Sequence, residues 1–520
     1  MRHPVYLDYA ASTPVAPEVV EAMTEALRSP DLVANPAAGT HSAGRAAEAA
    51  VENARAQIAA LINAAPEELV FTSGATEADN LAVIGTARFR QSRGRHLVTA
   101  LTEHKAVVES CRHLIAQGWR VTWLKPDADG LIPPASVEAA LQPDTVLVSL
   151  MHVNNETGVL QDLAGIGAVC RQHDVLLHVD AAQGAGRVPL DVHALQIDLL
   201  SLSAHKLYGP KGIGALFIDR DRVRRVEPLF FGGGQERGLR PGTLATHQVI
   251  GMGIAFEVAR VSAPADRQHV MRLRDRLWSR LQALPGVLRN GHPERNSGHI
   301  LNVSVASVEG ESLHAALQDL AVASGSACTS LTDEPSYVLR ALGRSAALAR
   351  SAVRFSFGRP TTMAEIDFAA DRFTAAVTAL RRRSPALAPG AAAELACQPA
   401  DTDPELAGTL VHGEAGSEEA GTWVVVTAGV RDGQVASLEA RVYGCPATMA
   451  ACDLALGLLR GGPVTALGTL ETAALSHPLG IPAAKSGCLL IIQDALRNCL
   501  ADWDNRGLMA SYRLANLHRR

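Results

Sequence analysis

The chain has 520 residues, a formal net charge of -5 at pH 7, and 19% charged against 47% hydrophobic residues. This length predicts more than one domain, and the composition is typical of a globular protein that buries a large core. The charge balance gives no electrostatic signal for nucleic acid or an anionic membrane, and no apolar run is long enough to span a bilayer. The 8 cysteines lie far apart, which argues against a disulfide framework; with no signal-peptide pattern at the start, a reducing cytoplasm is expected.

Short β-rich segments alternate with helical segments between residues 68 and 219. Near-continuous apolar strands separated by helices predict an α/β fold with a largely parallel sheet covered on both faces. The expected strands are Leu69–Thr72, His96–Thr99, Val146–Leu150, Val175–Val179, Leu199–Leu202 and Gly214–Ile218. A second α/β segment runs from about residue 261 to 383 and contains a further expected strand at Ile300–Ser304.

The composition changes after residue 383. Residues 384–404 are rich in Ala and Pro, which predicts a linker. Beyond it, two β-rich runs flank Arg431-Asp432-Gly433, a hairpin turn signal, and helices are expected near residues 447–460 and 487–503. The chain is therefore expected to divide into residues 1–383, a linker at 384–404, and a small α+β domain at 405–520.

A lysine, a carboxylate and a glycine-containing helix start follow three strands of the expected sheet. Lys206 comes just after a strand, where a desolvated amine suits Schiff-base chemistry. Asp180 ends another strand, where its carboxylate can hold a pyridinium nitrogen protonated. Residues 72–77 lead from a strand into a helix whose N-terminus can bind a phosphate. Each feature alone is ordinary, but together they predict a pyridoxal-phosphate site.

Residues 1 to about 383 resemble the IscS/NifS cysteine desulfurases, which are fold-type I pyridoxal-phosphate enzymes. Matching stretches occur along the whole segment. They include Tyr6–Tyr9, Thr72–Glu77, Thr102–Val107, Met151–Glu156, His178–Asp180, His205–Lys206, Arg240–Thr243, Ser324–Ser330 and Val353–Ser356. The resemblance implies a seven-stranded, mostly parallel sheet with a small C-terminal α/β subdomain. It also implies a homodimer that converts L-cysteine to L-alanine and passes the sulfur to an acceptor protein.

The resemblance further implies a role for each residue around the cofactor. Lys206 would bind pyridoxal 5'-phosphate and later move the Cα proton of the substrate, while His104 would stack over the ring as an acid or base. Asp180 would pair with the pyridine nitrogen, and Gln183 would contact the phenolic oxygen. The phosphate would be held by Gly74, Ala75, Thr76, Ser203 and His205, and by Thr243 from the neighbouring subunit.

The substrate-binding and sulfur-accepting residues are also implied by the resemblance. Asn155 would contact both cofactor and substrate, and Arg354 would bind the substrate carboxylate through its planar fork. Cys328 stands in a run of small residues at 324–330, which indicates a mobile loop of the long form of the family. Its thiolate would attack the substrate sulfur and become a persulfide.

Two other classes of protein could share part of these features. A selenocysteine lyase or an aminotransferase could use nearly the same cofactor site, and Cys328 is the residue that favours a desulfurase over them. A binding protein without catalytic activity, organised around the C-terminal part, would carry no cofactor on Lys206.

Residues from about 405 onward resemble, more faintly, the NifU/IscU iron–sulfur scaffold. Cys445 and Cys488 stand where two of the scaffold's cysteines occur, each near a helix N-terminus that favours a thiolate. Ala420 and Thr422 replace the scaffold's first cysteine and the aspartate beside it, and Gly487 replaces its histidine. The resemblance therefore implies a degenerate ligand set, short of the four ligands that a cluster needs.

Three interpretations of this C-terminal part remain open. Two subunits could combine Cys445 and Cys488 in one iron–sulfur site, to which Cys328 is a further candidate ligand. The domain could instead accept persulfide sulfur on Cys445 or Cys488 without building a cluster. It could also be a degenerate scaffold that only docks another protein.

Overall fold

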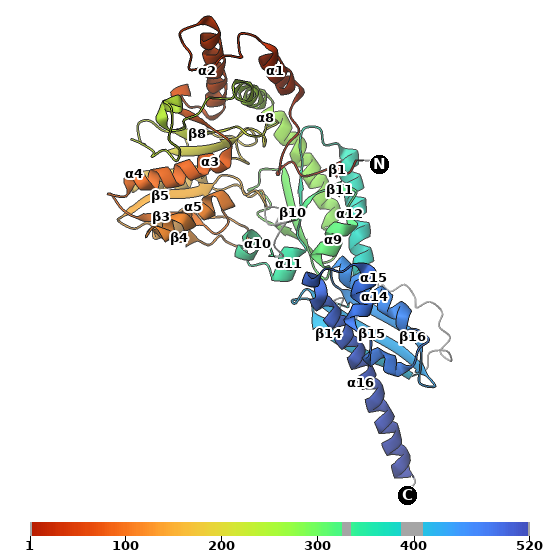
Figure 1. The fold of residues 1–520 in the computed structure, drawn as a ribbon. Helices are drawn as coiled ribbons and strands as arrows, with labels where there is room; N and C mark the ends of the chain where they lie inside the picture. Colours follow the sequence, from red (N-terminus) through yellow and green to blue (C-terminus); the bar gives the residue numbers. More distant parts are fainter. Residues whose placement is uncertain (1–2, 325–333, 386–408, 518–520) are drawn as a thin grey trace.

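The computed structural model describes residues 3–324, 334–385 and 409–517, with side chains described as far as residue 507. Most of the expected linker and the segment that contains Cys328 lie outside these residues. Three larger sheets organise the described part of the chain, and Figure 1 shows them arranged in a row, with the C-terminal one at the far end. The largest sheet has a hydrophobic core on each face, and the second sheet and the C-terminal sheet have one core each.

The largest sheet has seven strands in the order β2-β8-β7-β6-β5-β3-β4. These are β2 (Leu69–Thr72), β3 (His96–Ala100), β4 (Arg120–Leu124), β5 (Thr145–Met151), β6 (Leu176–Asp180), β7 (Leu199–Ser203) and β8 (Gly214–Ile218). Pairs that include β8 are antiparallel and the other pairs are parallel. The expected strands are all present, and β4, an edge strand that is only partly buried, is one that the sequence pattern did not indicate.

Helices cover both faces of this sheet because its buried strands point alternate apolar side chains to opposite sides. Leu69 and Phe71 pack on one face, and Val70 packs on the other. The first face is covered by α2 (Ser42–Ile62), α6 (Pro134–Ala140), α7 (Leu163–Gln172) and the first half of α8 (Thr246–Leu281). The second face is covered by α3 (Ala75–Asn80), a π-helical turn (Leu81–Gly85) that continues into α4 (Thr86–Arg90), and α5 (Lys105–Ala116). The helix α1 (Pro17–Arg28) packs against α8.

The second sheet is antiparallel, with the order β12-β13-β10-β9. Its strands are β9 (Val287–Asn290), β10 (Ile300–Val305), β12 (Ala323–Ser324) and β13 (Val353–Ser356). Its helices are the second half of α8, α9 (Gly310–Ala316), α10 (Tyr337–Ala341), α11 (Ala346–Arg350) and α12 (Met363–Arg383), and β1 (Val5–Tyr6) pairs with β11 (Leu320–Ala321) beside it. The 36-residue helix α8 contributes to the cores of both sheets and so links them.

The C-terminal part, called the tail below, is a three-stranded antiparallel sheet covered by helices. Its elements are β14 (Thr409–Ser417), β15 (Thr422–Arg431), β16 (Gln434–Tyr443), α14 (Pro446–Leu459), α15 (Thr472–Leu479) and α16 (Ser486–Leu517). The expected hairpin turn is confirmed: Asp432 and Gly433 both have positive φ, as a two-residue turn between twisted strands requires. The two expected helices are present as α14 and α16, and α16 runs on beyond the sheet (Figure 1).

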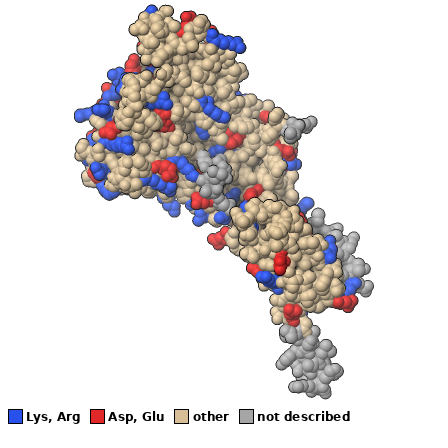
Figure 2. All heavy atoms as spheres, in the orientation of Figure 1, with Lys and Arg blue, Asp and Glu red and all other residues tan. Residues whose placement is uncertain are grey.

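The surface carries charges of both signs. On the face shown in Figure 2, basic and acidic side chains are interspersed over the larger part of the molecule and over the tail. Among the described residues, no helix is both long enough and apolar enough to cross a membrane.

A buried ion pair fixes the strand that leads to the glycine-containing helix start. The Arg55 guanidinium donates to both carboxylate oxygens of Glu236 at 2.8 Å, and Glu236 also accepts the backbone N–H of Phe71 on β2. The two charged side chains are only 5% and 3% exposed. Loss of Arg55 would therefore leave the Glu236 carboxylate buried without its ion-pair partner, whereas Arg55 has a second partner in Glu52 at 3.1 Å.

We expect Arg55→Met to lower the free energy of unfolding by about 3–5 kcal/mol, because the Glu236 carboxylate would stay buried without its cation. Adding Glu236→Gln to this variant should recover part of the loss, since no unpaired charge would remain. Urea unfolding followed by circular dichroism measures both. An Arg55→Met protein as stable as the wild type would contradict this role.

Candidate active site

A cavity of about 450 Å³ opens at the carboxyl ends of the parallel strands. Ligands of open α/β sheets commonly bind at this edge, because the strand ends and the helix starts meet there. The expected residues that line it are Gly74, Ala75, Thr76, His104, Asn155, Asp180, Gln183, Ser203, His205 and Lys206. The fold thus brings together side chains that are spread over more than a hundred residues of sequence.

The amine of Lys206 is held by a backbone carbonyl near the start of the chain. Lys206 follows β7, and its Nζ donates to the carbonyl oxygen of Ala10 at 2.6 Å. The Nε2 of Gln183 donates to the same oxygen at 2.7 Å, and the Oε1 of Gln183 contacts His299. Ala10 and His299 are residues of the site that the motif analysis missed. A backbone carbonyl leaves no trace in a residue pattern, and His299 stands outside any motif.

The carboxylate of Asp180 and the ring of His104 lie close together in this cavity. Asp180 ends β6, and its Oδ1 accepts the backbone N–H of Ala182 at 2.9 Å. His104 is the N-cap of α5, and its Nδ1 accepts the backbone N–H of Ala106 at 3.2 Å. A neutral His104 ring therefore carries its proton on Nε2. Side-chain atoms of Asp180 and His104 that could bind a ligand lie within 4.8 Å of one another.

A second layer of buried polar groups lies behind Asp180. Burial, and then the Asp180 carboxylate, raise the pKa of Asp79 on α3 well above its usual value. Burial lowers the pKa of His178 to about 3, so its 3.6 Å contact with Asp79 is not an ion pair. His178 instead bonds the hydroxyls of Ser149 and Ser201 on the two neighbouring strands. This layer holds β6 in register under Asp180.

The side of the cavity next to α3 is shaped for an anion. A Cβ at Gly74, the N-cap of α3, would meet no atom within 4 Å, so open space lies over the free backbone N–H groups of the first helical turn. Behind Gly74 the chain is tightly packed: a Cβ at Gly214 would lie 2.7 Å from the Gly74 Cα. Burial, followed by the charges of Lys206 and Lys211, lowers the pKa of His205 to about 4. His205 is therefore a neutral hydrogen-bonding group here.

These features fit pyridoxal phosphate. The cavity offers an amine in Lys206, a carboxylate in Asp180, a flat ring in His104 and an open helix N-terminus at Gly74. These are the groups needed to bind an aldehyde, a pyridine nitrogen, an aromatic face and a phosphate.

Two of the expected cofactor and substrate residues that the structure describes, Arg354 and Thr243, do not line the cavity. Arg354 is buried beside it, where it donates to the Asn155 carbonyl and pairs with Asp8, both at 2.8 Å. Asp8 thus occupies part of the fork that was expected to bind a substrate carboxylate. Thr243 is exposed, away from the cavity of its own chain. Cys328 lies outside the described residues.

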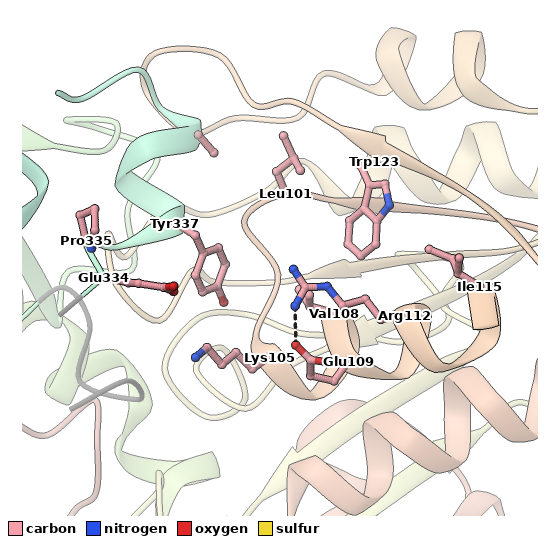
Figure 3. Close-up of a pocket in the computed structure, with 11 residues that line it drawn as sticks. Leu101, Lys105, Val108, Glu109, Arg112, Ile115, Trp123, Glu334, Pro335 and Tyr337 are labelled. Atoms are coloured by element: carbon pink, nitrogen blue, oxygen red, sulfur yellow. Dashed lines mark hydrogen bonds and ion pairs between the residues drawn. The ribbon is translucent and has the colours of Figure 1, made fainter. Parts of the chain in front are cut away.

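A second and larger cavity, of about 570 Å³, lies beside α5 and the start of α10 (Figure 3). Its walls include the apolar side chains of Leu101, Trp123 and Tyr337. Arg112 also lines it and pairs with Glu109 at 2.7 Å, the dashed line in Figure 3. The expected cofactor residues are not among its lining, so size alone does not identify the active site.

Comparison with known proteins agrees with this geometry. Residues 5–368 match the family model for class-V aminotransferases. Cysteine desulfurases IscS of Shewanella woodyi and of Pseudomonas aeruginosa are each 54% identical to the chain over 385 residues, covering 74% of it and 95% of the relative. Among solved structures, a NifS-like protein is 33% identical with a TM-score of 0.66, covering 71% of this chain and 98% of that one. The structure of SspA in complex with cysteine is 39% identical with a TM-score of 0.61, covering 68% and 99%.

The chain therefore belongs to the class-V aminotransferase family of pyridoxal-phosphate enzymes, with the mixed sheet and flanking helices of fold type I. Within that family it is a cysteine desulfurase of the IscS/NifS type, and its cofactor is pyridoxal 5'-phosphate.

The buried histidines predict how stability depends on pH. Burial lowers the pKa of His152 to about 4 and that of His178 to about 3, whereas the unfolded chain protonates histidine near pH 6.5. Because the unfolded state binds more protons below pH 6.5, the free energy of unfolding falls as the pH drops from there towards 4. His152 alone accounts for about 3 kcal/mol of this loss.

We expect His152→Gln to flatten this dependence, measured as the free energy of urea unfolding at a series of pH values between neutral and mildly acidic. The comparison concerns the slope, so a general loss of stability in the variant does not obscure it. A slope as steep as that of the wild type would contradict the assignment of a neutral, buried His152.

Proposed function

We propose that the desulfurase reaction uses the side chains that converge on the 450 Å³ cavity and that sulfur leaves it as a persulfide on Cys328. The observation that carries this proposal is that Lys206, Asp180 and His104 line one cavity at the carboxyl ends of the strands. Pyridoxal phosphate, when bound, supplies an electron sink that makes the substrate Cα proton acidic and the Cβ–S bond labile.

Some of the residues around the cofactor bind it, and others also transfer protons. Lys206 would hold the cofactor through Nζ, and the same amine would move the Cα proton of the substrate. Asp180 keeps the pyridine nitrogen protonated, and Gln183 contacts the phenolic oxygen. His104 stacks on the ring, and its Nε2 exchanges a proton with the substrate, while Nδ1 is retained by the N-cap of α5.

Hydrogen-bond donors hold the phosphate on the open side of the cavity. Those from the same chain are Gly74, Ala75, Thr76, Ser203 and His205. His205 acts as a neutral donor because of its lowered pKa. Thr243 reaches the phosphate of a second subunit. Two observations support this: Thr243 is exposed, and it does not line the cavity of its own chain. The enzyme is therefore a homodimer whose two sites are shared.

The substrate L-cysteine is oriented by Arg354 and Asn155. The Nε of Arg354 is buried and has no hydrogen-bond partner among the described residues, while its other nitrogens hold Asp8 and the Asn155 carbonyl. A substrate carboxylate takes the place of Asp8 on this guanidinium, because a bidentate pair with a carboxylate is the geometry that arginine favours.

Sulfur transfer follows from these positions. The Cys328 thiolate attacks the substrate sulfur, a new S–S bond forms, and the Cβ–S bond breaks. The substrate carbon takes up protons and leaves as L-alanine, and Cys328 carries the persulfide.

The tail is a NifU/IscU-like domain with a degenerate ligand set, joined to the desulfurase of residues 1–383 through the linker at 384–404. Its separate core and its order of three strands followed by helices support this. Thr422, at a scaffold ligand position, donates from Oγ1 to the sulfur of Cys488 at 3.8 Å. Among the described residues, three or more His, Cys, Asp or Glu side chains come within 4.8 Å of one another only at Asp79, His104 and Asp180. This favours sulfur acceptance on Cys445 or Cys488 over an iron–sulfur site within one tail.

We expect Cys328→Ala to lower alanine formation from cysteine by at least about a hundredfold, because the sulfur acceptor is lost. The visible absorbance of the bound cofactor should persist in this variant and disappear in Lys206→Ala. Alanine is measured by chromatography in single-turnover reactions. Undiminished alanine formation by Cys328→Ala would overturn the proposed role of this thiol.

Thr243→Ala should weaken cofactor binding by about 1.5–3 kcal/mol, the value of a hydrogen bond to a charged group. A heterodimer of one Thr243→Ala chain and one Lys206→Ala chain tests which subunit supplies the threonine that contacts the phosphate. Its single intact lysine lies in the Thr243→Ala chain, so its phosphate meets the unaltered Thr243 of the other chain. Cofactor titration should give wild-type affinity at that site, whereas weakened affinity would contradict a contribution from the second subunit.

A further inference from the structure

Two thiols meet in the tail at the starts of two helices. Cys445 is the N-cap of α14 and is buried, and Cys488 lies in the first turn of α16 and is partly exposed. Both sulfurs interact with the Thr448 hydroxyl, and each thiol changes the pKa of the other. The Thr448 hydroxyl lies 3.4 Å from the Cys445 sulfur, and the Thr422 hydroxyl lies 3.8 Å from the Cys488 sulfur. Residues from β15, α14 and α16 thus form one small polar cluster.

The two sulfurs differ in acidity. The neighbouring Cys445 thiol, helped by the hydroxyls of Thr448 and Thr422 and the charge of Lys485, lowers the pKa of Cys488 against the opposing effect of burial. The neighbouring Cys488 thiol, together with burial, raises the pKa of Cys445. Cys488 is also the more exposed of the two sulfurs, which makes it the accessible nucleophile of the pair, with Cys445 buried beside it.

This cluster lies where the tail contacts the second sheet of the desulfurase. Ser312 on α9 donates to the carbonyl of Gly444, next to Cys445, at 2.8 Å. Lys485, close to Cys488, pairs with Glu311 on α9 at 2.7 Å. The same sheet includes β12, which ends at Ser324, directly before the segment that contains Cys328. The thiol pair therefore lies beside α9 of the desulfurase, close to the second sheet.

We propose that Cys488 and Cys445 form a sulfide-releasing dithiol, in which Cys488 accepts the persulfide sulfur and Cys445 then expels it as hydrogen sulfide. This inference rests on the proposed transfer of sulfur from Cys328 to the tail. The neighbouring positions of the two thiols carry it: Cys445 contacts Thr448, with which Cys488 also interacts, and residues next to each cysteine contact consecutive residues of α9.

The reaction balances in two exchange steps. The Cys488 thiolate attacks the outer sulfur of the Cys328 persulfide, and Cys328 leaves as a thiolate. Cys445 then gives up its proton and attacks the Cys488 sulfur, so that a Cys445–Cys488 disulfide forms and the outer sulfur leaves as hydrosulfide, which takes up that proton. The two thiols lose two electrons and the released sulfur gains them. A thiol or dithiol reductant then returns the disulfide to two thiols and completes the cycle.

The test supplies the full-length holoenzyme with limiting L-cysteine and no added reductant. Released sulfide is measured per alanine formed, and thiols are then blocked for mass spectrometry without reduction. We expect the wild type to release sulfide and to link the peptides of Cys445 and Cys488 by a disulfide. Cys445→Ser should lose sulfide release and retain a persulfide on Cys488, and Cys488→Ser should retain the sulfur on Cys328.

Cys452→Ala is the matched control, because Cys452 is a buried cysteine of the same tail that packs in its core. It should release sulfide and form the disulfide as the wild type does. A stable persulfide on wild-type Cys488 with no disulfide, or sulfide release by Cys445→Ser at the wild-type level, would overturn the dithiol mechanism alone. Sulfur that stays on wild-type Cys328, with both tail thiols unmodified, would overturn the transfer to the tail as well.

Discussion

The carbonyl oxygen of Ala10 accepts hydrogen bonds from two side chains of the cofactor cavity, Lys206 and Gln183, at 2.6 and 2.7 Å. The backbone N–H of the same residue donates to the Ser356 hydroxyl on β13. One short segment near the start of the chain therefore spans the largest sheet and the second sheet. The position of the lysine amine depends on how these two sheets are held together, as well as on the strand that precedes it.

The same segment also reaches the substrate side of the site. Asp8 pairs with Arg354, which is fixed on β13 and donates to the Asn155 carbonyl beside the cavity. A carboxylate that replaces Asp8 would loosen one of the contacts between the N-terminal segment and the second sheet. In the proposed binding mode, substrate binding is thus coupled to the packing of the two sheets.

Much of the fold of the largest sheet could be predicted, because its strands are continuous apolar runs. The place of the site could be predicted because the ends of parallel strands meet at one edge of the sheet. That rule brings Asp180 and the Lys206 turn together without any knowledge of contacts. Edge strands were harder to predict from the sequence. The strand β4 is half-exposed, and β14 has glycines and polar residues among few apolar ones. The contact between the buried side chains of Asp79 and His178 could not be predicted from the sequence either, because the tertiary fold decides which polar groups are buried. The meeting of Cys445 and Cys488 depends likewise on how α14 and α16 pack, although both positions stood out as helix starts.

The contacts of α9 with the tail hold the two tail thiols against the desulfurase of the same chain. Ser312 and Glu311 hold the region of Gly444 and Lys485 against the desulfurase. For partners tethered in this way the effective concentration is on the order of millimolar, whatever the concentration of the protein. Small thiols in solution and separate acceptor proteins must compete against that local excess. In the proposed transfer, a fused tail directs the fate of the sulfur through proximity, before any difference in chemical affinity among acceptors has an effect.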